Sequence, residues 1–388
     1  MTGRWNPLAC RGTALPMELL LLAKLLAIPI LATQFWRTLP EPYLAFLPLL
    51  EGWPAGWVRF GLMGLLVISS TALLFNFYPR LAAFGAGVSI LLAVASSRLY
   101  YGNNHTLVGL VFVFIGLYSP RWGKWPLRLQ ISLVYFGAGL NKLLDADWRS
   151  GQFFAQWTAW MYPDSALTAL QARLPELALG KAICWGTIAT ELSLAPLLLI
   201  PRTRTAAIWL SILFHTGLTV FTGKTFGLFL YVMLASMLAV ADWPRGRPLV
   251  IYDGDCGLCN ATRRLMQWLD RDRFLDWRPL QSGVGEQFGL SRAALTQRAH
   301  LVAEGPLWAG FRAARTVLLL LPVTYFALLL AIMGGDRILD DGRRIVVPLM
   351  VLLFSPLMNP AGEWVYGWVA RNRYWLWPGS QCEVTPKQ

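Results

Sequence analysis

The sequence predicts a polytopic α-helical membrane bundle of about eight spans, followed by a C-terminal α/β domain. Of its 388 residues, 56% are hydrophobic and only 14% are charged, whereas charged residues make up about 25% of an ordinary soluble domain. The apolar runs lie in residues 1–241, and alternating strand and helix patterns follow a linker at 242–248 that contains proline and glycine. We therefore expect a membrane domain at 1–245 and a second domain at 246–388.

The formal net charge of +13 invites a nucleic-acid-binding interpretation, which we reject. The arginines are scattered at the ends of apolar runs instead of gathering on one face. Basic residues at loop ends are what membrane insertion requires. We therefore expect membrane lipid, and no nucleic acid, as a partner.

Eight apolar runs predict the spans, although several are short for a hydrocarbon core of about 30 Å. Basic residues follow the even-numbered spans, whereas segments 34–56 and 145–180 mix acids with few bases. The positive-inside rule then places both termini and the second domain on the cytoplasmic side of a bacterial-type inner membrane. The runs are 15–33, 57–76, 81–97, 105–119, 127–143, 181–200, 206–222 and 225–241.

In the second domain the patterns follow the order strand, helix, strand, helix, hairpin, helix, which is typical of an α/β domain of the thioredoxin-like kind. The expected ranges are 249–252, 256–271, 274–279, 291–297, a hairpin at 299–303 and 306–309, and a helix from 310.

Two further apolar stretches, at 316–334 and 345–359, allow two interpretations. They form either amphipathic helices packed on the domain or the membrane surface, or an extra membrane hairpin. Both leave the C-terminus on the same side of the membrane.

Cys256 and Cys259 form a Cys-x-x-Cys pair where a predicted strand and an Asp-Gly turn lead into a helix. Unpaired amides and the helix dipole lower a thiol pKa at such a position, and thiolate is the form that attacks disulfides. A zinc site would need two more ligands, and only His300 and Cys382 are available, at no recognised spacing. We therefore predict redox cysteines and no metal.

The same turn also resembles the Asp-x-Asp nucleophile turn of a haloacid-dehalogenase phosphatase, with Asp340 and Asp341 as a distant acidic pair. That class also needs a lysine, and residues 249–388 contain only Lys387, near the C-terminus. We reject the phosphatase interpretation.

Polar residues within apolar spans are costly to bury, so each is a candidate site residue. His105 and Lys142 fall at the same predicted non-cytoplasmic end of adjacent spans, where a partly desolvated lysine can act as a base. The alternative is that Lys142 extends to the interface and His105 hydrogen-bonds backbone. Glu191 and His215 are further candidates, with structural hydrogen bonding as their alternative.

The membrane part resembles the vitamin K-dependent γ-carboxylase and its relatives, the HTTM family. The resemblance implies that Lys142 deprotonates a quinol and that His105 assists it. Glu191 and His215, as polar residues within the spans, are the cofactor-binding candidates. The resemblance therefore implies a quinone-like, lipid-soluble cofactor. The large region with which the carboxylase binds its protein substrate is missing here, so cofactor use is expected to survive where carboxylation does not. The matching pieces are Asn103-Asn-His-Thr, Ala138-Gly-Leu-Asn-Lys-Leu-Leu-Asp-Ala-Asp-Trp148, Phe214-His215, Tyr231-Val-Met-Leu-Ala-Ser and Asp242-Trp-Pro-Arg.

Residues 249–382 resemble the DCC family of thiol-disulfide oxidoreductase-like proteins. The resemblance implies a thioredoxin-like fold and protein-disulfide reductase activity, with Cys256 as nucleophile and Cys259 as the resolving cysteine. Asp253 and Asp255 then position the pair or accept a proton, unless they only cap the helix. The matching pieces are Tyr252-Asp-Gly-Asp-Cys-Gly-Leu-Cys-Asn, Arg278-Pro-Leu-Gln-Ser and Trp364-Val-Tyr-Gly-Trp-Val-Ala-Arg-Asn-Arg-Tyr.

Two features depart from the thioredoxin-like pattern or lie outside it. No proline precedes the strand at Arg298-Ala-His-Leu-Val, where thioredoxin-like enzymes carry a cis-proline that holds substrate. Cys382 is expected to be a lone thiol, with a third redox partner as the alternative.

The expected function is therefore a membrane-anchored thiol-disulfide oxidoreductase that acts on a protein thiol or disulfide. The reducing cytosol favours the reductase direction. A quinone-like carrier would connect the cysteines with Lys142 and His105, which lie toward the opposite face. The alternatives are a lipid or lipoprotein binding or transport module with vestigial cysteines, and a carboxylase-like enzyme on an unknown substrate.

Overall fold

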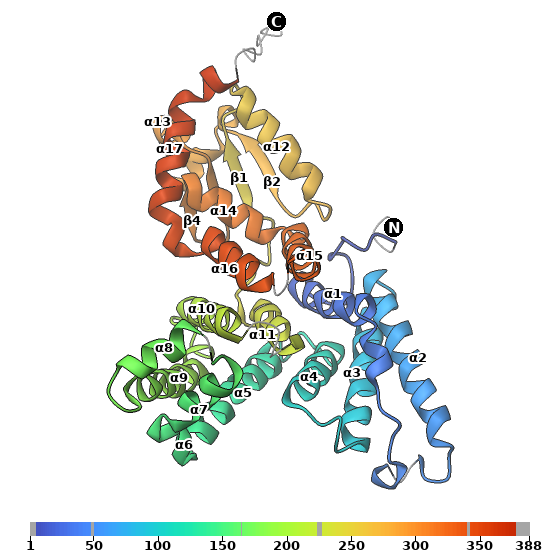
Figure 1. Ribbon diagram of the computed structural model, residues 1–388. Helices are drawn as coiled ribbons and strands as arrows, with labels where there is room; N and C mark the ends of the chain where they lie inside the picture. The colour runs from blue at the N-terminus through green and yellow to red at the C-terminus, as the bar shows by residue number, and fades with distance from the viewer. Residues whose placement is uncertain (1–4, 48–49, 164, 223–226, 340–341, 378–388) are drawn as a thin grey trace, which may run out of the picture.

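The computed structural model describes residues 5–47, 50–163, 165–222, 227–339 and 342–377. Asp340, Asp341, Cys382 and Lys387 lie outside these ranges. The helices before residue 241 form two neighbouring groups, α1–α4 and α5–α10, with α11 between them and the C-terminal domain above (Figure 1). The described part is thus a helical bundle that carries a small mixed α/β domain.

A helix forms at each of the eight predicted runs. Three shorter helices lie between α5 and α9, in the segment 145–180 to which the sequence analysis assigned no element: α6 (Ala146–Ser150), α7 (Gln152–Met161) and α8 (Ala166–Arg173). The eight helices are α1 (Met17–Ala32), α2 (Ala55–Leu74), α3 (Pro79–Ser96), α4 (Asn103–Gly116), α5 (Trp125–Leu144), α9 (Ala178–Leu197), α10 (Arg204–Thr222) and α11 (Gly227–Val240).

Three of these helices, α2, α3 and α10, are long and apolar enough to cross a membrane, among the residues described. A span needs about 20 residues, and α4 has only 14. Two bent helix pairs in the C-terminal part pass the same test, which brings the total to as many as five. The apolar helices therefore indicate a membrane protein, and the count of about eight spans stays a prediction.

Glycines allow α3 and α4 to pack closely. A Cβ added at Gly87 would lie 2.7 Å from the carbonyl oxygen of Gly109, and one at Gly116 would lie 2.7 Å from the backbone nitrogen of Phe84. Small residues at such crossings are typical of membrane helices, because they let the backbones approach. The end of α4 thereby reaches the first turn of α3.

The C-terminal domain has the expected order of elements. Its sheet has the strand order β2-β1-β3-β4, in which β1 is parallel to β2 and antiparallel to β3, and β3 is antiparallel to β4. Val250 and Ile251 are buried, as a central strand requires. The elements are β1 (Leu249–Tyr252), α12 (Gly257–Leu269), β2 (Asp276–Pro279), the 3-10 turn η5 (Leu280–Ser282), α13 (Arg292–Gln297), β3 (His300–Val302), β4 (Leu307–Ala309) and α14 (Gly310–Leu320).

The two apolar stretches mainly form α15 (Pro322–Ile338) and α16 (Arg343–Phe354), which lie between the sheet and the bundle. After a 3-10 turn, α17 (Asn359–Leu376) runs along the C-terminal domain and packs on α14 and α12. Helix α16 packs on α10. Asp336 pairs with Arg343 and accepts a hydrogen bond of 3.0 Å from Tyr231 of α11. The pair α14 and α15 bends by 79°, and α16 bends from the following segment by 60°. Each pair fits a broken span or a re-entrant loop, so the hairpin alternative stays open.

The N-terminal segment joins the bundle to the C-terminal domain. Lys24 of α1 donates from Nζ to the carbonyl oxygens of Pro7 and Ala9, both at 2.7 Å. The amides of Cys10 and Arg11 donate to the Asp272 carboxylate at 2.9 Å. Burial raises the pKa of Asp272, whereas the hydrogen bonds from the Cys10 and Arg11 amides oppose this effect. The Asp272 carboxylate therefore serves as the acceptor for both amides.

Replacing Asp272 with alanine should free the N-terminal segment, because the amides of Cys10 and Arg11 lose their acceptor. The expected cost is about 1–3 kcal/mol for each amide left unsatisfied, seen as faster hydrogen exchange at residues 6–11. Asp276→Ala is the control, since the Asp276 carboxylate pairs with the exposed Arg278, and exposed pairs contribute little. Equal exchange in both variants would contradict the assignment.

Candidate active site

Cys256 caps the N-terminus of α12 with its own sulfur. Strand β1 ends at Tyr252, and the turn that follows brings Cys256 to the N-cap position, where Sγ accepts the Cys259 amide at 3.3 Å. Cys256 is 1% exposed and Cys259 is partly exposed. The Cys256 sulfur is therefore largely shielded from solvent, whereas Cys259 is partly accessible.

The two cysteines differ in ionisation. The Cys259 thiol, which hydrogen-bonds the Cys256 sulfur, is the main cause that lowers the pKa of Cys256 from 9.0 to about 6. The Cys259 amide and the Arg373 charge lower this pKa further, whereas burial and Asp253 oppose them. The same hydrogen bond raises the pKa of Cys259. The pair thus holds a thiolate at Cys256 and a thiol at Cys259 near neutral pH.

An ion pair lies beside the cysteines. Arg373 of α17 donates from Nη2 to Asp253 Oδ2 at 2.8 Å, and the two side chains are 10% and 6% exposed. Asp253 follows β1 directly, so the pair ties the end of α17 to the turn that carries Cys256. It also brings a positive charge to the thiolate.

Gln281, in η5 after β2, holds the acidic turn. Its amide nitrogen donates to Asp253 Oδ1 at 3.2 Å and to Asp255 Oδ2 at 2.8 Å, and its oxygen accepts the Gly254 amide at 3.1 Å. The carboxylates of Asp253 and Asp255 therefore position the turn. The helix cap comes from the Cys256 sulfur.

Three motifs far apart in the sequence thus meet at one place. Sequence analysis quoted the segments that contain Gln281, Tyr366 and Arg373 without giving these residues a role. Tyr366 accepts the Ala299 amide at 2.9 Å, and burial raises its pKa, with Cys259 among the nearby groups. The signal that these residues belong to the site was their presence in the quoted motifs.

His300, which the sequence analysis considered as a zinc ligand, lies in the sheet. His300 starts β3 and is buried, and burial lowers its pKa. Within the described ranges, no three His, Cys, Asp or Glu side chains gather as metal ligands.

In the bundle, Lys142 and Glu191 form an ion pair. Lys142 Nζ lies 2.9 and 2.8 Å from the two carboxylate oxygens and 5.1 Å from the centre of the Trp148 ring. His215 has hydrogen-bond partners of its own. The Tyr135 hydroxyl lies 2.8 Å from His215 Nε2 and 2.6 Å from the Ser211 hydroxyl. Both Glu191 and His215 thus have polar partners inside the bundle, as the structural alternative in the sequence analysis expected.

His105 lies apart from this group. Its ring stacks on Tyr100 with centroids 4.3 Å apart, and Nδ1 lies 3.0 Å from the Tyr100 carbonyl oxygen. No contact among the described residues joins His105 to Lys142. The Lys142 ammonium pairs with Glu191, and we derive no step through a quinone.

The cysteines lie at the end of the C-terminal domain that is remote from the bundle. Helix α12 has 13 residues, or about 20 Å at 1.5 Å per residue, and its far end leads to Asp272 and the N-terminal segment. Figure 1 shows the start of α12 and the end of α17 together at the top of the domain. The site therefore faces away from the membrane helices.

These features define a redox membrane protein: apolar helices joined to an α/β domain with an ionisable cysteine pair. Residues 117–243 match the HTTM domain family, and residues 250–347 match the DCC1-like thiol-disulfide oxidoreductase family. The chain therefore joins an HTTM domain to a DCC1-like domain. No solved structure matches the chain.

Proposed function

We propose that this protein is a membrane-anchored thiol-disulfide oxidoreductase that uses Cys256 and Cys259. The observation that carries the proposal is the Cys256 sulfur, which accepts the Cys259 amide at 3.3 Å and has its pKa lowered to about 6. A thiolate poised near ambient pH is the effective attacking species in disulfide exchange. It also argues against vestigial cysteines.

The reaction balances over two steps. The Cys256 thiolate attacks one sulfur of a protein disulfide, and the other sulfur leaves as a thiolate and takes up a proton. Cys259 then loses its proton and attacks Cys256, which releases the second substrate thiol and leaves a Cys256–Cys259 disulfide. Two electrons pass to the substrate, and a cellular dithiol reductant returns the pair to its reduced form.

The sheet supports a thioredoxin-like fold for this domain. A central β1 parallel to β2, with an antiparallel β3 and then β4, places the cysteine pair at the carboxyl end of β1. Ligand and reaction sites of open α/β sheets favour that edge.

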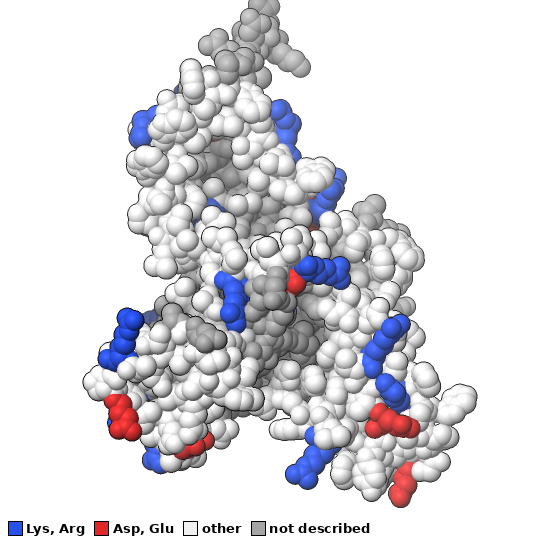
Figure 2. Space-filling view, in the orientation of Figure 1, with Lys and Arg blue, Asp and Glu red and all other residues white. Residues whose placement is uncertain are grey.

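Charge supports a cytoplasmic position for the domain at an inner membrane. On the face shown in Figure 2, acidic side chains lie mostly toward the end of the bundle away from the C-terminal domain. Basic loops belong on the cytoplasmic side, where thiols stay reduced. The partner is then a cytoplasmic protein disulfide, and the quinone-like cofactor stays a prediction of the resemblance.

Trapping tests the proposal. Cys259→Ser leaves Cys256 without its resolving thiol, so mixed disulfides should accumulate on this variant and run as adducts in non-reducing gels. Cys256→Ser is the matched control and should trap far less, because the remaining Cys259 thiol has lost its Cys256 partner but is still kept from ionising by burial. If Cys256→Ser traps equally well, or neither variant traps, the proposed chemistry is wrong.

A further inference from the structure

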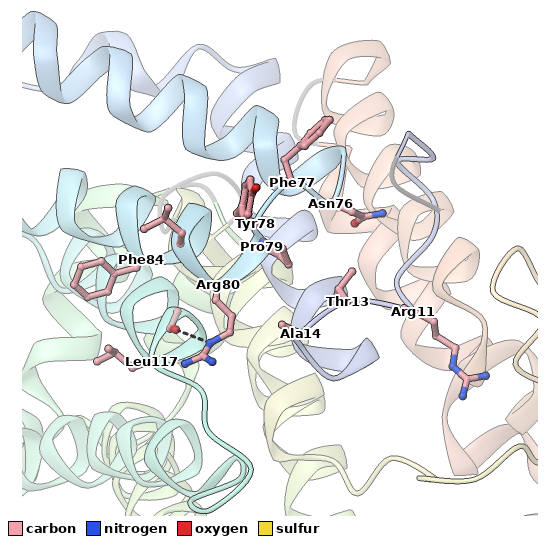
Figure 3. Close-up of a pocket in the computed structure, with 13 residues that line it drawn as sticks. Arg11, Thr13, Ala14, Asn76, Phe77, Tyr78, Pro79, Arg80, Phe84 and Leu117 are labelled. Atoms are coloured by element: carbon pink, nitrogen blue, oxygen red, sulfur yellow. Dashed lines mark hydrogen bonds between the residues drawn. The ribbon is translucent and has the colours of Figure 1, made fainter. Parts of the chain in front are cut away.

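A cavity of about 850 Å³ opens in the bundle, away from the cysteines. It lies between N-terminal residues 11–14, the turn from α2 to α3 at residues 76–81, and the end of α4 at Gly116 and Leu117 (Figure 3). The redox chemistry proposed above makes no use of it.

The lining is basic. It contains Arg11 and Arg80 and no acidic residue. Arg80 Nε donates to the Gly116 carbonyl oxygen at 3.3 Å, and the Arg11 guanidinium lies 4.9 Å from the centre of the Phe274 ring. Neither arginine side chain makes an ion pair within the described part of the chain. In Figure 3, Arg80 extends toward Leu117, and Arg11 points away at the opposite end.

One side of the cavity is apolar and open. Leu81 is 70% exposed and Leu117 is 58% exposed, and Phe84 lies beside them. Both α2 and α3 are span candidates, so the turn between them lies where lipid headgroups meet water. Exposed leucines at that depth face acyl chains.

The turn is held in shape before any ligand arrives. Asn76 and Tyr78 have φ values of 61° and 38°, which side chains other than glycine rarely adopt. Asn76 Nδ2 donates to the Ala9 carbonyl oxygen at 3.2 Å, which ties the turn to the N-terminal segment. Pro79 starts α3, and the first turn of a helix favours anions.

We propose that this cavity binds the phosphate headgroup of an anionic phospholipid. Arg80 and the first turn of α3 hold the phosphate, and the acyl chains follow Leu81, Phe84 and Leu117. Basic pockets between membrane helices on the cytoplasmic side recognise such headgroups. Because Arg11 and the Cys10 amide also contact the C-terminal domain, bound lipid would strengthen the contact between the two domains.

Lipid titration of the purified full-length protein in a non-ionic detergent, followed by native mass spectrometry, tests this site. Phosphatidylglycerol should bind saturably, and phosphatidylcholine with the same chains should bind about tenfold more weakly. Inorganic phosphate alone should not displace the lipid. Arg80→Gln should weaken phosphatidylglycerol binding about tenfold through loss of charge-assisted hydrogen bonds.

Arg98→Gln is the control, because Arg98 is exposed just beyond the other end of α3 and should leave binding unchanged. Arg80→Lys keeps the charge and should give an intermediate affinity. Leu81→Gln should also weaken lipid binding, and it does so without removing the hydrogen bond between Arg80 and Gly116. Equal loss in Arg80→Gln and Arg98→Gln would overturn the site. Equal binding of both lipids would overturn the role of charge, and displacement by phosphate would assign the cavity to a soluble anion.

Discussion

Replacing Arg373 with glutamine should destabilise the C-terminal domain and make the active-site thiol harder to ionise. The substitution leaves the 6%-exposed Asp253 carboxylate without its cation, and breaking a buried pair in this way costs about 3–5 kcal/mol. Arg373 also lowers the pKa of Cys256, so that pKa should rise in the variant. Chemical unfolding and the pH dependence of alkylation measure the two effects.

Arg371→Gln is the matched control, since Arg371 lies two residues away on α17 and is exposed. It should behave like the parent protein in both measurements. Adding Asp253→Asn to Arg373→Gln should recover part of the stability, because no buried charge then remains unpaired. An Arg373→Gln protein as stable as Arg371→Gln, with an unchanged thiol pKa, would refute the role assigned to the pair.

Replacing Lys142 with alanine should destabilise the membrane bundle. The substitution leaves Glu191, whose side chain is 9% exposed, buried without its partner, at a cost of about 3–5 kcal/mol. The thermal unfolding temperature of the protein in detergent is the measurement. The expected shift is a clear decrease relative to the parent protein.

Lys181→Ala is the control for this substitution, because Lys181 is exposed on α9, the helix that carries Glu191. The double variant Lys142→Ala and Glu191→Gln should recover much of the loss. A Lys142→Ala protein that unfolds with the control would show that the ion pair has no structural role.

The elements around the cysteines could be predicted from local patterns. The apolar run before Asp253 predicted β1 with its observed bounds, and the two strands of the hairpin lie within the predicted ranges. Turn residues and apolar alternation act over a few residues, so a single sequence contains this information.

The contacts that build the site could not be predicted in the same way. Arg373 and Asp253 are 120 residues apart, and nothing local tells an arginine which carboxylate it will meet. The sequence argument credited backbone amides for the ionisation of Cys256. In the structure the Cys259 thiol is the larger cause, which depends on a rotamer that spacing alone does not fix.

Within the bundle, helix positions were predictable and partners were not. All eight predicted runs are helical, but the amphipathic segment that forms α7 was not predicted as a helix. The sequence analysis placed His105 and Lys142 at the same end of adjacent spans. In the structure Lys142 pairs with Glu191, and the His105 ring stacks on Tyr100. The position of a residue along a span can be estimated from the sequence. The direction in which its side chain points depends on how the helix is rotated by packing, which a single sequence does not reveal.

Ionisation of Cys256 also links redox state to stability. Its folded pKa of about 6 lies below the ordinary 9.0, so the reduced domain gains stability that is fully present above about pH 9 and is lost as the pH falls through 6. This dependence should disappear in Cys256→Ser.

The most direct test of the account is a titration of thiolate absorbance in the reduced protein, with Cys184 and Cys382 replaced by serine. Burial raises the pKa of Cys10 to about 12, so that thiol stays silent over the range. The account predicts one ionisation centred near pH 6, absent from Cys256→Ser and shifted upward in Arg373→Gln. An ionisation of Cys256 no lower than the ordinary 9.0 would contradict it.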